Sequence, residues 1–495
     1  MNLPINTLNL HSTSPVPCPG LKVARDRARE HLAHRVGPDG ALRATCGSRI
    51  LESALMLTLL KRQGVLPRAQ AQLAAYVQAA PRHGPFDGLV ARAATGRTPS
   101  AAEAGAFLAS FSHATGARKQ LLLQSILRLL GCEVPPTGPV PDYRGQAIWT
   151  SLVLCAIGMV EAAGTADGEA GLEYVTGVLA ERRGQVFEGN ALAHLVALHC
   201  LHQVDQGHSA IGDGIAALEA IRAPGGGMPF IAGQEIFVTA LAASCLARAG
   251  AEGDLLERMG DFLVGAQLPD GGWGYTAVAS QSDVDDTCRC LGALRVIGAS
   301  RYREALDRGE RYLLTMAGAD GSFPTYVRGH EGEVDMTAGA ILTLGPRLGE
   351  RLTASADFIA SKQHQDGTFP TSWTISAASV AIQAIDALEA SGLHSHSVQR
   401  AVSSLAGSQN ADGGFSQRSG MPSDVLSTAQ AVQALTGRAS GRVVPDALNY
   451  LSERQHGDGS FTSVPDQIGP RPIPYDFPVL ATVQALFALT SRRTP

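Results

Sequence analysis

The sequence contains 495 residues, of which 45% are hydrophobic, and its formal net charge is −5. A chain of this length exceeds what one ordinary hydrophobic core contains, so two large domains are expected. The mildly acidic balance argues against a nucleic-acid-binding protein, which usually carries a basic surface, and without a run of about 18 apolar residues no transmembrane helix is expected.

The start of the chain and its cysteines indicate a cytoplasmic protein. The first twenty residues contain proline and serine but lack the basic start and apolar stretch of a signal peptide. The eight cysteines are scattered, and most lie in apolar runs, which is typical of reduced thiols rather than of a disulfide framework. Alanine and leucine are abundant and aromatic residues make up only 5%, which favours helices over sheets.

The N-terminal half contains several apolar runs of helical length. Helices are expected at Ser48–Arg62, Lys119–Leu130, Ala147–Ala163 and Ala191–Val204. The proline-rich stretch Val134–Pro141 interrupts them and divides this half into smaller blocks. We interpret residues 1–250 as one helical domain, whose N-terminal helix could pack with the second domain.

The C-terminal half is built from repeats. A turn of the form Gln-x-x-Asp-Gly-x-aromatic, or a close variant, recurs with its aspartate at positions 270, 320, 366, 412 and 458. Asp-Gly is a strong turn signal, because glycine accepts positive φ and aspartate bonds to its own backbone. The turns are Gln267–Trp273, Ala317–Phe323, Gln363–Phe369, Gln409–Phe415 and Gln455–Phe461.

Each repeat contains two helices. An apolar helix follows the turn, as at Thr287–Ile297, Thr337–Leu344 and Thr428–Leu435, and an amphipathic helix such as Arg303–Met316 leads to the next turn. This pattern predicts a ring of helical hairpins with the apolar helices inside, and it assigns residues 251–495 to the second domain. The fold class is therefore all-α, with two α/α barrels.

Traces of the same turn occur in the N-terminal half. Gly37–Leu42 is a degenerate copy, and Gly225–Phe230 is a second candidate. These two segments indicate that the N-terminal domain has a related architecture.

The starts of four inner helices can be aligned on a threonine. An acid four residues before it is explained by helix N-capping and by the helix dipole, and Asp424 needs no further explanation. Capping does not explain Asp286, or three carboxylates within four residues, and Asp335 repeats the middle acid one helix later. The segments are Asp283-Val-Asp-Asp-Thr287, Glu333-Val-Asp-Met-Thr337, Asp424-Val-Leu-Ser-Thr428 and Pro478-Val-Leu-Ala-Thr482.

Three crowded carboxylates suit the protonation of an alkene. An isolated alkene is a very weak base, so its protonation needs a strong acid in a dry cavity. Asp283, Asp285 and Asp286 cannot all ionise at close range, so one pKa should rise, although the helix N-terminus acts in the opposite direction. Burial of Asp285 in an apolar barrel would keep this carboxyl neutral.

A carbocation formed in this way needs a water-free pocket with aromatic faces. We expect Trp149, Trp273, Tyr275, Tyr326, Trp373 and Tyr475 to contact the substrate, and Phe187, Phe237 and Phe477 are further candidates for the wall.

The segment Asp283-Val-Asp-Asp-Thr287 resembles the Asp-x-Asp-Asp-Thr motif of class II terpene cyclases, and the turns resemble their Gln-Trp repeats, although only Gln267–Trp273 keeps the tryptophan. The resemblance covers residues 260–490. It implies two helical barrels, called β and γ, that enclose the substrate. It also implies that Asp285 donates the proton and that Asp283 and Asp286 tune this acid.

Within that family, the length and the three tryptophans resemble bacterial cyclases of prenyl diphosphates more than squalene-hopene cyclases. The implied substrate is geranylgeranyl or farnesyl diphosphate, bound with Mg²⁺. The implied product is a labdane, halimane or drimane diphosphate. The magnesium-binding motifs of class I synthases are absent from the sequence, and no metal ligand is assigned to the protein. A monomer or a homodimer is expected.

The resemblance has one gap. We find no clear copy of the acidic γ-domain motif that helps such cyclases to bind magnesium and diphosphate. Arg49, Arg118 and Lys119 are therefore our candidates for the diphosphate site, and Tyr475 and His330 are candidates for the base that ends the reaction.

Three alternatives remain open. A zinc-dependent protein prenyltransferase β subunit shares the helical ring, and Asp286, Cys288 and either His330 or His364 would be its ligands. It leaves three carboxylates and the long N-terminal half unexplained. The second alternative is a non-catalytic helical toroid, and the third is a squalene-hopene-type cyclase.

Overall fold

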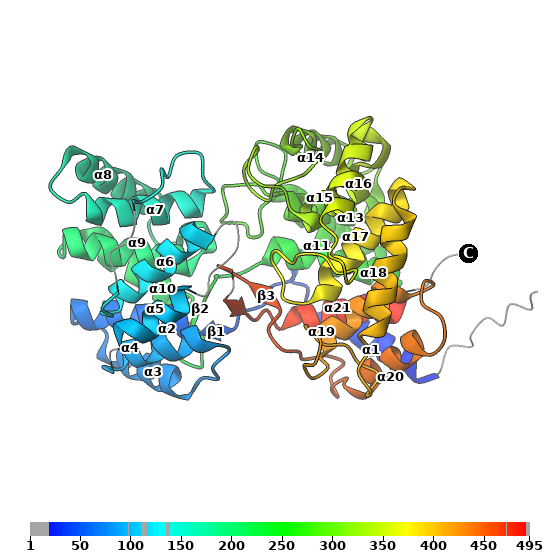
Figure 1. Ribbon diagram of the computed structural model, residues 1–495, viewed down its shortest axis with the longest axis horizontal. Helices are drawn as coiled ribbons and strands as arrows, with labels where there is room; N and C mark the ends of the chain where they lie inside the picture. The colour runs from blue at the N-terminus through cyan, green and yellow to red at the C-terminus, as the bar shows by residue number, and fades with distance from the viewer. Residues whose placement is uncertain (1–18, 98, 110–115, 135–138, 472, 492–495) are drawn as a thin grey trace, which may run out of the picture.

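The computed structural model describes residues 19–97, 99–109, 116–134, 139–471 and 473–491. These residues form two helical lobes that lie side by side, the N-terminal one on the left and the C-terminal one on the right (Figure 1). The all-α prediction is confirmed. The strands of the described residues are two-residue segments in antiparallel pairs: β1 (Ser48–Arg49) with β2 (Met228–Pro229), and β3 (Gln467–Ile468) with β4 (Pro474–Tyr475).

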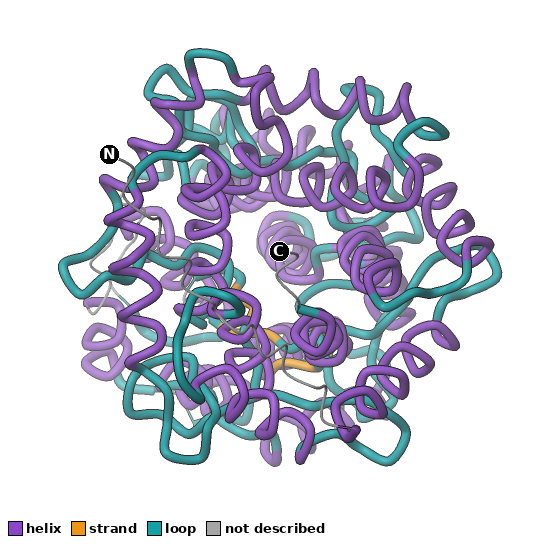
Figure 2. Tube along the Cα trace, turned by 90° about the vertical axis from the view of Figure 1, so that its right-hand side faces the viewer, coloured by secondary structure: helices purple, strands orange, loops and turns teal. Residues whose placement is uncertain are grey.

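The C-terminal lobe is a closed α/α barrel, which Figure 2 shows end-on. Each inner helix packs against the next, and the last packs against the first. The inner helices are α11 (Glu235–Arg248), α13 (Val284–Gly298), α15 (Val334–Leu344), α17 (Ala377–Ser391), α19 (Val425–Leu435) and α21 (Val479–Thr490). The outer helices are α12 (Gly253–Gly265), α14 (Arg303–Met316), α16 (Arg351–Ser361), α18 (Ser395–Gly407), α20 (Val443–Glu453) and α1 (Pro19–Arg35), and the 3₁₀ segment η2 (Gly345–Leu348) precedes α16.

The repeated turn follows an outer helix, precedes an inner helix and packs against the start of the next outer helix. Gly413 has a φ of +82°, and a Cβ there would lie 2.9 Å from the carbonyl oxygen of Asp446 in α20. Gln409 donates 2.8 Å hydrogen bonds from Nε2 to the carbonyls of Gly413 and Val443. The Gln and Gly of the repeat therefore fix the turn against the start of the outer helix.

The repeated threonine fixes the same turn to the inner helix. Thr428 Oγ1 accepts a 2.9 Å hydrogen bond from the Phe415 amide and donates a 2.6 Å bond to the Asp424 carbonyl. Thr287 makes the equivalent bonds to Trp273 and Asp283 at 3.0 and 2.6 Å. This is the physical reason for the threonine in the sequence alignment.

The first repeat of the barrel is split by the N-terminal domain. The Leu42 amide donates a 2.8 Å bond to Thr239 Oγ1 of α11, which is the bond that the aromatic residue makes in four of the five turns. Gln455 of the last turn donates to the Ala24 carbonyl of α1 at 2.8 Å, which makes α1 the outer helix after α21. The turn Gly37–Leu42 therefore belongs to the barrel, and the segment between it and α11 is an insertion.

The inserted domain repeats the same plan with other side chains. Ser53 Oγ and His194 Nδ1 replace the threonine, and they accept from the amides of Met228 and Phe187 at 2.8 and 3.0 Å. Gly225–Phe230 is thus a copy of the turn, as predicted. The elements are α2 (Ile50–Gln63), α3 (Pro67–Ala79), α4 (Pro85–Ala94), α5 (Ala101–Ala109), α6 (Gly116–Leu129), α7 (Ile148–Glu161), α8 (Ala166–Glu181), η1 (Phe187–Gly189), α9 (Ala191–Val204) and α10 (Ser209–Ala220).

Each lobe has its own hydrophobic core. The core of the inserted domain runs from Ile50 to Met228 and includes Ile473. The barrel core contains Ala28, Leu32, Leu42 and Cys46 and most of the buried apolar residues from Ile231 onward. The sequence analysis placed one domain boundary near residue 250. In the structure the chain passes from one domain to the other twice, near residues 47 and 230. Helix α11 packs inside the barrel because its apolar residues face α13 and α21.

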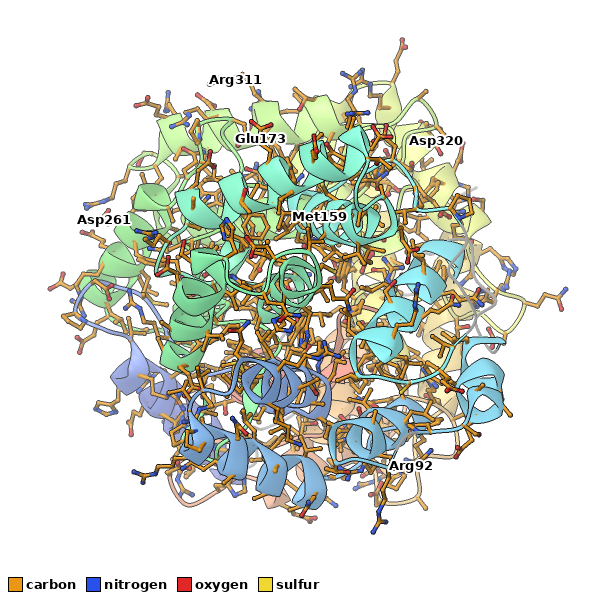
Figure 3. The ribbon with its side chains drawn as sticks, turned by 90° about the vertical axis from the view of Figure 1, so that its left-hand side faces the viewer. Arg92, Met159, Glu173, Asp261, Arg311 and Asp320 are labelled. Carbon is orange, nitrogen blue, oxygen red and sulfur yellow. The ribbon has the colours of Figure 1, made fainter. Side chains whose placement is uncertain are left out.

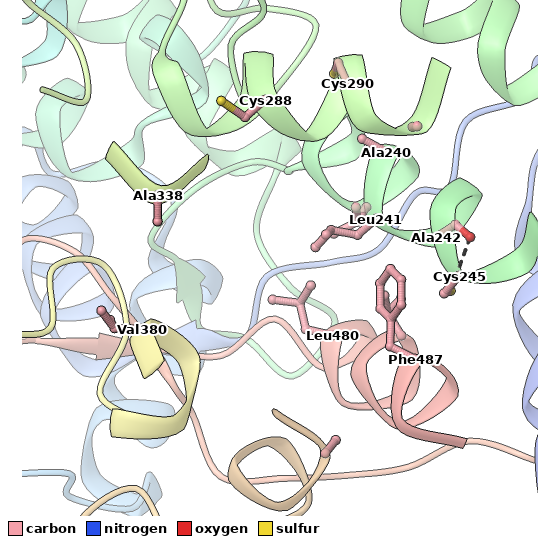
Figure 4. Close-up of a cluster of buried hydrophobic side chains, with 14 of the residues drawn as sticks. Ala240, Leu241, Ala242, Cys245, Cys288, Cys290, Ala338, Val380, Leu480 and Phe487 are labelled. Atoms are coloured by element: carbon pink, nitrogen blue, oxygen red, sulfur yellow. Dashed lines mark hydrogen bonds between the residues drawn. The ribbon is translucent and has the colours of Figure 1, made fainter. Parts of the chain in front are cut away.

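Two further views locate residues of each lobe. Seen from the N-terminal side, α7 with Met159 lies in front of the barrel, and Asp261 and Asp320 of the barrel lie toward its outer edge (Figure 3). Inside the barrel, Leu241 of α11 and Leu480 of α21 approach each other near the axis (Figure 4).

The cysteines of the described residues are buried and form no disulfide, and Cys18 lies outside those residues. Within the same part of the chain, no helix combines the length and the apolar character that crossing a membrane requires.

Candidate active site

A cavity begins where the two lobes meet and continues into the barrel. Its unfilled space is about 1310 Å³, part of which is open to solvent. Trp149 and Asn190 line it from the N-terminal domain, each of the six inner helices contributes at least one side chain, and segment 466–477 closes one side. Strand β3 of this segment lies between the lobes (Figure 1).

The start of α13 places three carboxyl groups on this cavity. Asp283 is the N-cap, with extended backbone, and its side chain accepts a 2.8 Å hydrogen bond from the Asp286 amide. The expected capping role is therefore present. Asp283, Asp285 and Asp286 all line the cavity.

The three carboxyls differ in environment. Asp283 and Asp286 are buried, with 2% and 5% of their surface exposed, whereas 26% of the Asp285 side chain is exposed. Asp285 Oδ1 accepts a 3.0 Å hydrogen bond from Arg289 Nε. The sequence argument considered burial of Asp285. In the structure the buried carboxyls are those of Asp283 and Asp286, and Asp285 is the more exposed of the three.

Burial changes the acidity of the two inner carboxyls. It raises the pKa of Asp283 to about 7, although hydrogen bonds from Asp286 work against this rise. Burial, followed by the charge of Asp283, raises the pKa of Asp286 well above its ordinary range. This pair therefore retains a proton near neutral pH, which limits the negative charge beside Asp285.

The structure adds residues that the sequence argument did not assign to the site. Arg289, one turn after Asp285, lines the cavity, and so do Asp335 of α15 and Asp466. The alignment of inner helices already contained the signal for Asp335, which occupies the place of Asp285 in the next repeat. The signal for Arg289 was its position two residues after the repeated threonine, where Gln430 and Gln484 also face the cavity.

Aromatic side chains form much of the wall. Trp149, Tyr275, Tyr326, Trp373 and Tyr475 line the cavity, together with Phe237 and Phe477. The rings of Tyr326 and Trp373 meet edge to face at 5.9 Å. The Trp373 Nε1 group donates 3.0 Å bonds to Thr325 Oγ1 and Glu333 Oε2, which fixes the ring.

Two predicted aromatic residues are absent from the wall. Trp273 is fully buried in the barrel core, and its Nε1 donates a 2.6 Å bond to the Leu263 carbonyl. Phe187 is buried in the core of the inserted domain. Trp273 occupies the aromatic position of the turn, where Phe323 and Phe415 are equally buried, so its role is structural.

The comparisons with known proteins agree with this geometry. The prenyltransferase alpha-alpha toroid domain family matches residues 236–377 and 373–471. Drimenyl diphosphate synthase from Streptantibioticus cattleyicolor is 38% identical, over 96% of this chain and 96% of its own. The enzyme of the same name from Streptomyces showdoensis is 37% identical over 97% and 96%. The chain belongs to the class II terpene cyclases.

A solved structure supports the fold over the whole chain. The ent-copalyl diphosphate synthase from Streptomyces platensis superimposes with a TM-score of 0.59, at 17% identity, over 96% of this chain and 99% of that one. The two chains therefore share their fold over almost their whole length.

Two of the three basic residues that we assigned to the diphosphate, Arg49 and Lys119, do not line the cavity. Arg49 is 5% exposed and forms a buried ion pair with Glu52. Its Nη1 donates to the Gly469 carbonyl at 2.6 Å, and its guanidinium lies 4.4 Å from the centre of the Phe230 ring. Arg49 therefore fastens the two domains of the cyclase together. Lys119 does not line the cavity, and the side chain of Arg118 lies outside the described residues.

The proposed zinc ligands are not assembled. Asp286 and Cys288 are buried in α13, whereas His330 and His364 are exposed in loops. Among the residues that the structure describes, no three His, Cys, Asp or Glu side chains form a metal-binding group. The family assignment, rather than this absence, replaces the prenyltransferase alternative.

The two candidates for the terminating base occupy different places. His330 is exposed and does not line the cavity. Tyr475 does line it, and its hydroxyl accepts from Gln234 Nε2 at 2.9 Å and donates to Gln467 Oε1 at 3.1 Å.

Proposed function

We propose that this class II terpene cyclase converts farnesyl diphosphate into a drimane-type bicyclic diphosphate, with Asp285 as the acid. The observation that carries the proposal is the Asp285 carboxyl, which projects into an aromatic-lined cavity beside two buried, proton-retaining carboxyls. The names of the two relatives favour the farnesyl chain length over geranylgeranyl.

The proposed reaction begins with proton transfer. The Asp285 carboxyl gives its proton to the terminal alkene, which leaves a cation on the neighbouring carbon. The next alkene attacks this cation and a third attacks the second cation, so two carbon–carbon bonds close two rings. The last cation loses a proton, and the diphosphate stays attached. Substrate and product therefore have the same formula.

The walls of the cavity support the developing cations. The proposal is that the ring faces of Trp373, Tyr326 and Tyr275 take the place of water around the cations. Each face is worth about 0.5–2 kcal/mol toward a nearby cation. Exclusion of water also protects the cations from capture.

The diphosphate is proposed to enter with Mg²⁺. This ion is held by few protein carboxylates and mainly by phosphate oxygens and water, so a dedicated cluster of protein ligands is not required. Asp466 and Asp476, which line the cavity near segment 466–477, have the oxygen ligands that Mg²⁺ prefers. The ion would supply charge neutralisation for the diphosphate.

The proposal is tested by incubating the purified protein with farnesyl or geranylgeranyl diphosphate and Mg²⁺. Phosphatase treatment and product analysis should then show a bicyclic drimane alcohol from the farnesyl substrate, at a higher kcat/KM than any product of the longer one. A preference for geranylgeranyl diphosphate would overturn the chain length. Consumption of neither substrate, with turnover of squalene, would favour the triterpene alternative.

A further inference from the structure

Arg289 creates a conflict at the proposed acid. It donates from Nε to Asp285 Oδ1 at 3.0 Å, and it is the one basic side chain among the described residues that line the cavity. A guanidinium in contact favours the ionised carboxylate, yet a proton donor must be neutral. When Asp285 is protonated, Arg289 loses its partner just where a carbocation has to form.

A second carboxyl is placed to resolve this conflict. Asp335 occupies in the first turn of α15 the position that Asp285 occupies in α13, and the two helices pack side by side. It lines the same cavity and is 6% exposed. Ser372 Oγ donates to its Oδ2, and the Met336 amide donates to its Oδ1 at 3.2 Å. Asp335 is therefore held in place on the wall of the cavity that Arg289 also lines.

The charges of the three side chains act on one another. Burial lowers the pKa of Arg289, but the charge of Asp285 and, more weakly, that of Asp335 raise it above its ordinary value. Burial, then Glu333 and then Asp285 contribute to raising the pKa of Asp335 to about 7, against the hydrogen bond from Ser372. A positive group beside Asp335 would stabilise its ionised form.

Arg289 has donor groups left for a second partner. The hydrogen bond that its side chain makes within the described residues goes through Nε to Asp285, and 29% of the side chain is exposed. A guanidinium has further N–H donors at its two Nη atoms, which a second carboxyl could accept.

We propose that Asp335 is a positioning residue that takes Arg289 away from Asp285 and so allows Asp285 to be protonated. The inference rests on the proposed role of Asp285 as the acid. In the resting state Arg289 pairs with ionised Asp285. When Asp285 takes up a proton from solvent, Arg289 pairs with Asp335, and the pair of Arg289 and Asp335 has no net charge toward the developing cation. After the proton has passed to the alkene, Arg289 returns.

Other charged groups also face these side chains. On α13 they are Asp283, Asp286 and the buried, neutral thiol of Cys288. Glu333 at the start of α15 is paired with Arg471 from the segment after β3. Asp466 and Asp476 lie on the cavity wall. All of these remain in the variants below, so differences between variants report on Arg289 and Asp335.

The test is the pH dependence of kcat at saturating farnesyl diphosphate and Mg²⁺. Under the proposal only the protonated acid can react, so kcat falls as pH rises. In Asp335→Asn, Arg289 stays on Asp285 and favours its ionised form, so the midpoint of the fall should move about one unit toward acid. In Arg289→Gln, the ionised form loses its partner, so the midpoint should move toward alkaline pH by a similar amount.

Three further variants serve as controls. Asp335→Glu keeps the charge and should restore most of the native profile, and the double variant Arg289→Gln/Asp335→Asn should lie between the two single ones. Asp424→Asn changes another buried cap carboxyl, outside the cavity lining, and should leave the midpoint unchanged. Circular dichroism confirms folding, and if Asp335→Asn does not fold, Arg289→Gln and Asp335→Glu still decide.

Opposite shifts in the two single variants support the inference. Equal midpoints in both, or shifts in the same direction, overturn it. Asp285→Asn is measured alongside. If that variant still converts the substrate, the proposed function is wrong. If it is inactive but the midpoint of kcat against pH is unchanged in the other variants, only the role of Asp335 is wrong.

Discussion

The starts of α13 and α19 have the same backbone plan and different chemistry. In both, an aspartate N-cap accepts a 2.8 Å hydrogen bond from the amide three residues later, and a threonine ties the helix to the preceding turn. Directly before the threonine, α19 has Leu426 and Ser427 where α13 has Asp285 and Asp286. The comparison separates what the repeat needs from what the reaction needs.

The difference also shows how a structural motif becomes a catalytic one. In α13 and α19 the cap and the threonine already position the first turn of the inner helix. Two substitutions in that turn suffice to present one carboxyl to the cavity and to bury another behind it. The same logic places Asp335 in α15, where a single extra acid stands in the first turn.

The largest expected effect follows from removing the acid itself. Asp285→Asn should lower kcat by at least about 10³-fold, because an amide cannot donate the proton and no other route to the cation is available. The fold should persist, since Asp285 is partly exposed. Asp424→Asn in α19 should change kcat by less than about threefold. Steady-state kinetics of the two variants measures the contrast, and equal losses would contradict it.

The second prediction concerns pH and the buried cap Asp283. The folded protein keeps this carboxyl protonated up to a pKa of about 7, whereas the unfolded chain releases the proton near the ordinary pKa of 3.8. The native state thus binds more protons in this window, so the free energy of unfolding declines as pH rises from about 4 to 7 and is constant above.

Asp283→Asn should remove that decline. The amide oxygen still accepts the Asp286 N–H but does not titrate, so at pH 8 the variant should be more stable than the native protein by about 2 kcal/mol. Thermal unfolding at pH 5 and pH 8 provides the measurement. The same loss of stability with pH in variant and native protein would show that Asp283 is not the group responsible.

The threonine anchors should matter equally in the two helices. Thr287→Val and Thr428→Val each leave a buried amide, that of Trp273 or Phe415, without its acceptor. Each should cost about 1–3 kcal/mol of stability. Calorimetry would reveal the shifts, and a large loss at only one of the two sites would mean that the repeats are not equivalent.

The smallest effect is expected from the caps alone. Asp424→Ala should destabilise α19 by about 1 kcal/mol, because the Ser427 amide loses its side-chain acceptor. Turnover per folded molecule should stay close to native. A strong loss of turnover would mean that α19 takes part in the chemistry and that the comparison with α13 is drawn in the wrong place.

Much of this architecture could be predicted from the sequence, because the repeat is written in residues with local physical roles. The Asp-Gly turns, the apolar inner helices and the shared threonine fixed the barrel, and the acid cluster that remained after alignment identified the site. Even the worn turn Gly37–Leu42 and the candidate Gly225–Phe230 proved to be copies of the turn.

What could not be predicted depended on contacts between distant segments. The insertion of the N-terminal domain became visible only when α1 paired with the last turn through Gln455. Trp273 and Trp373 look alike in the sequence, yet one lies in the core and the other on the cavity. Arg49 is buried against the carbonyls of Gly469 and Ile473, more than 400 residues away in the chain.

The most direct test of the central claim is cyclisation in heavy water. Farnesyl diphosphate is incubated with the native protein and Mg²⁺ in D₂O, and the product is analysed before and after removal of its diphosphate. Proton-initiated cyclisation predicts an intact diphosphate and one deuterium on the ring carbon that was the terminal alkene CH, with no such product from Asp285→Asn. A cyclic product without deuterium at that carbon, or with its diphosphate lost, would contradict the account.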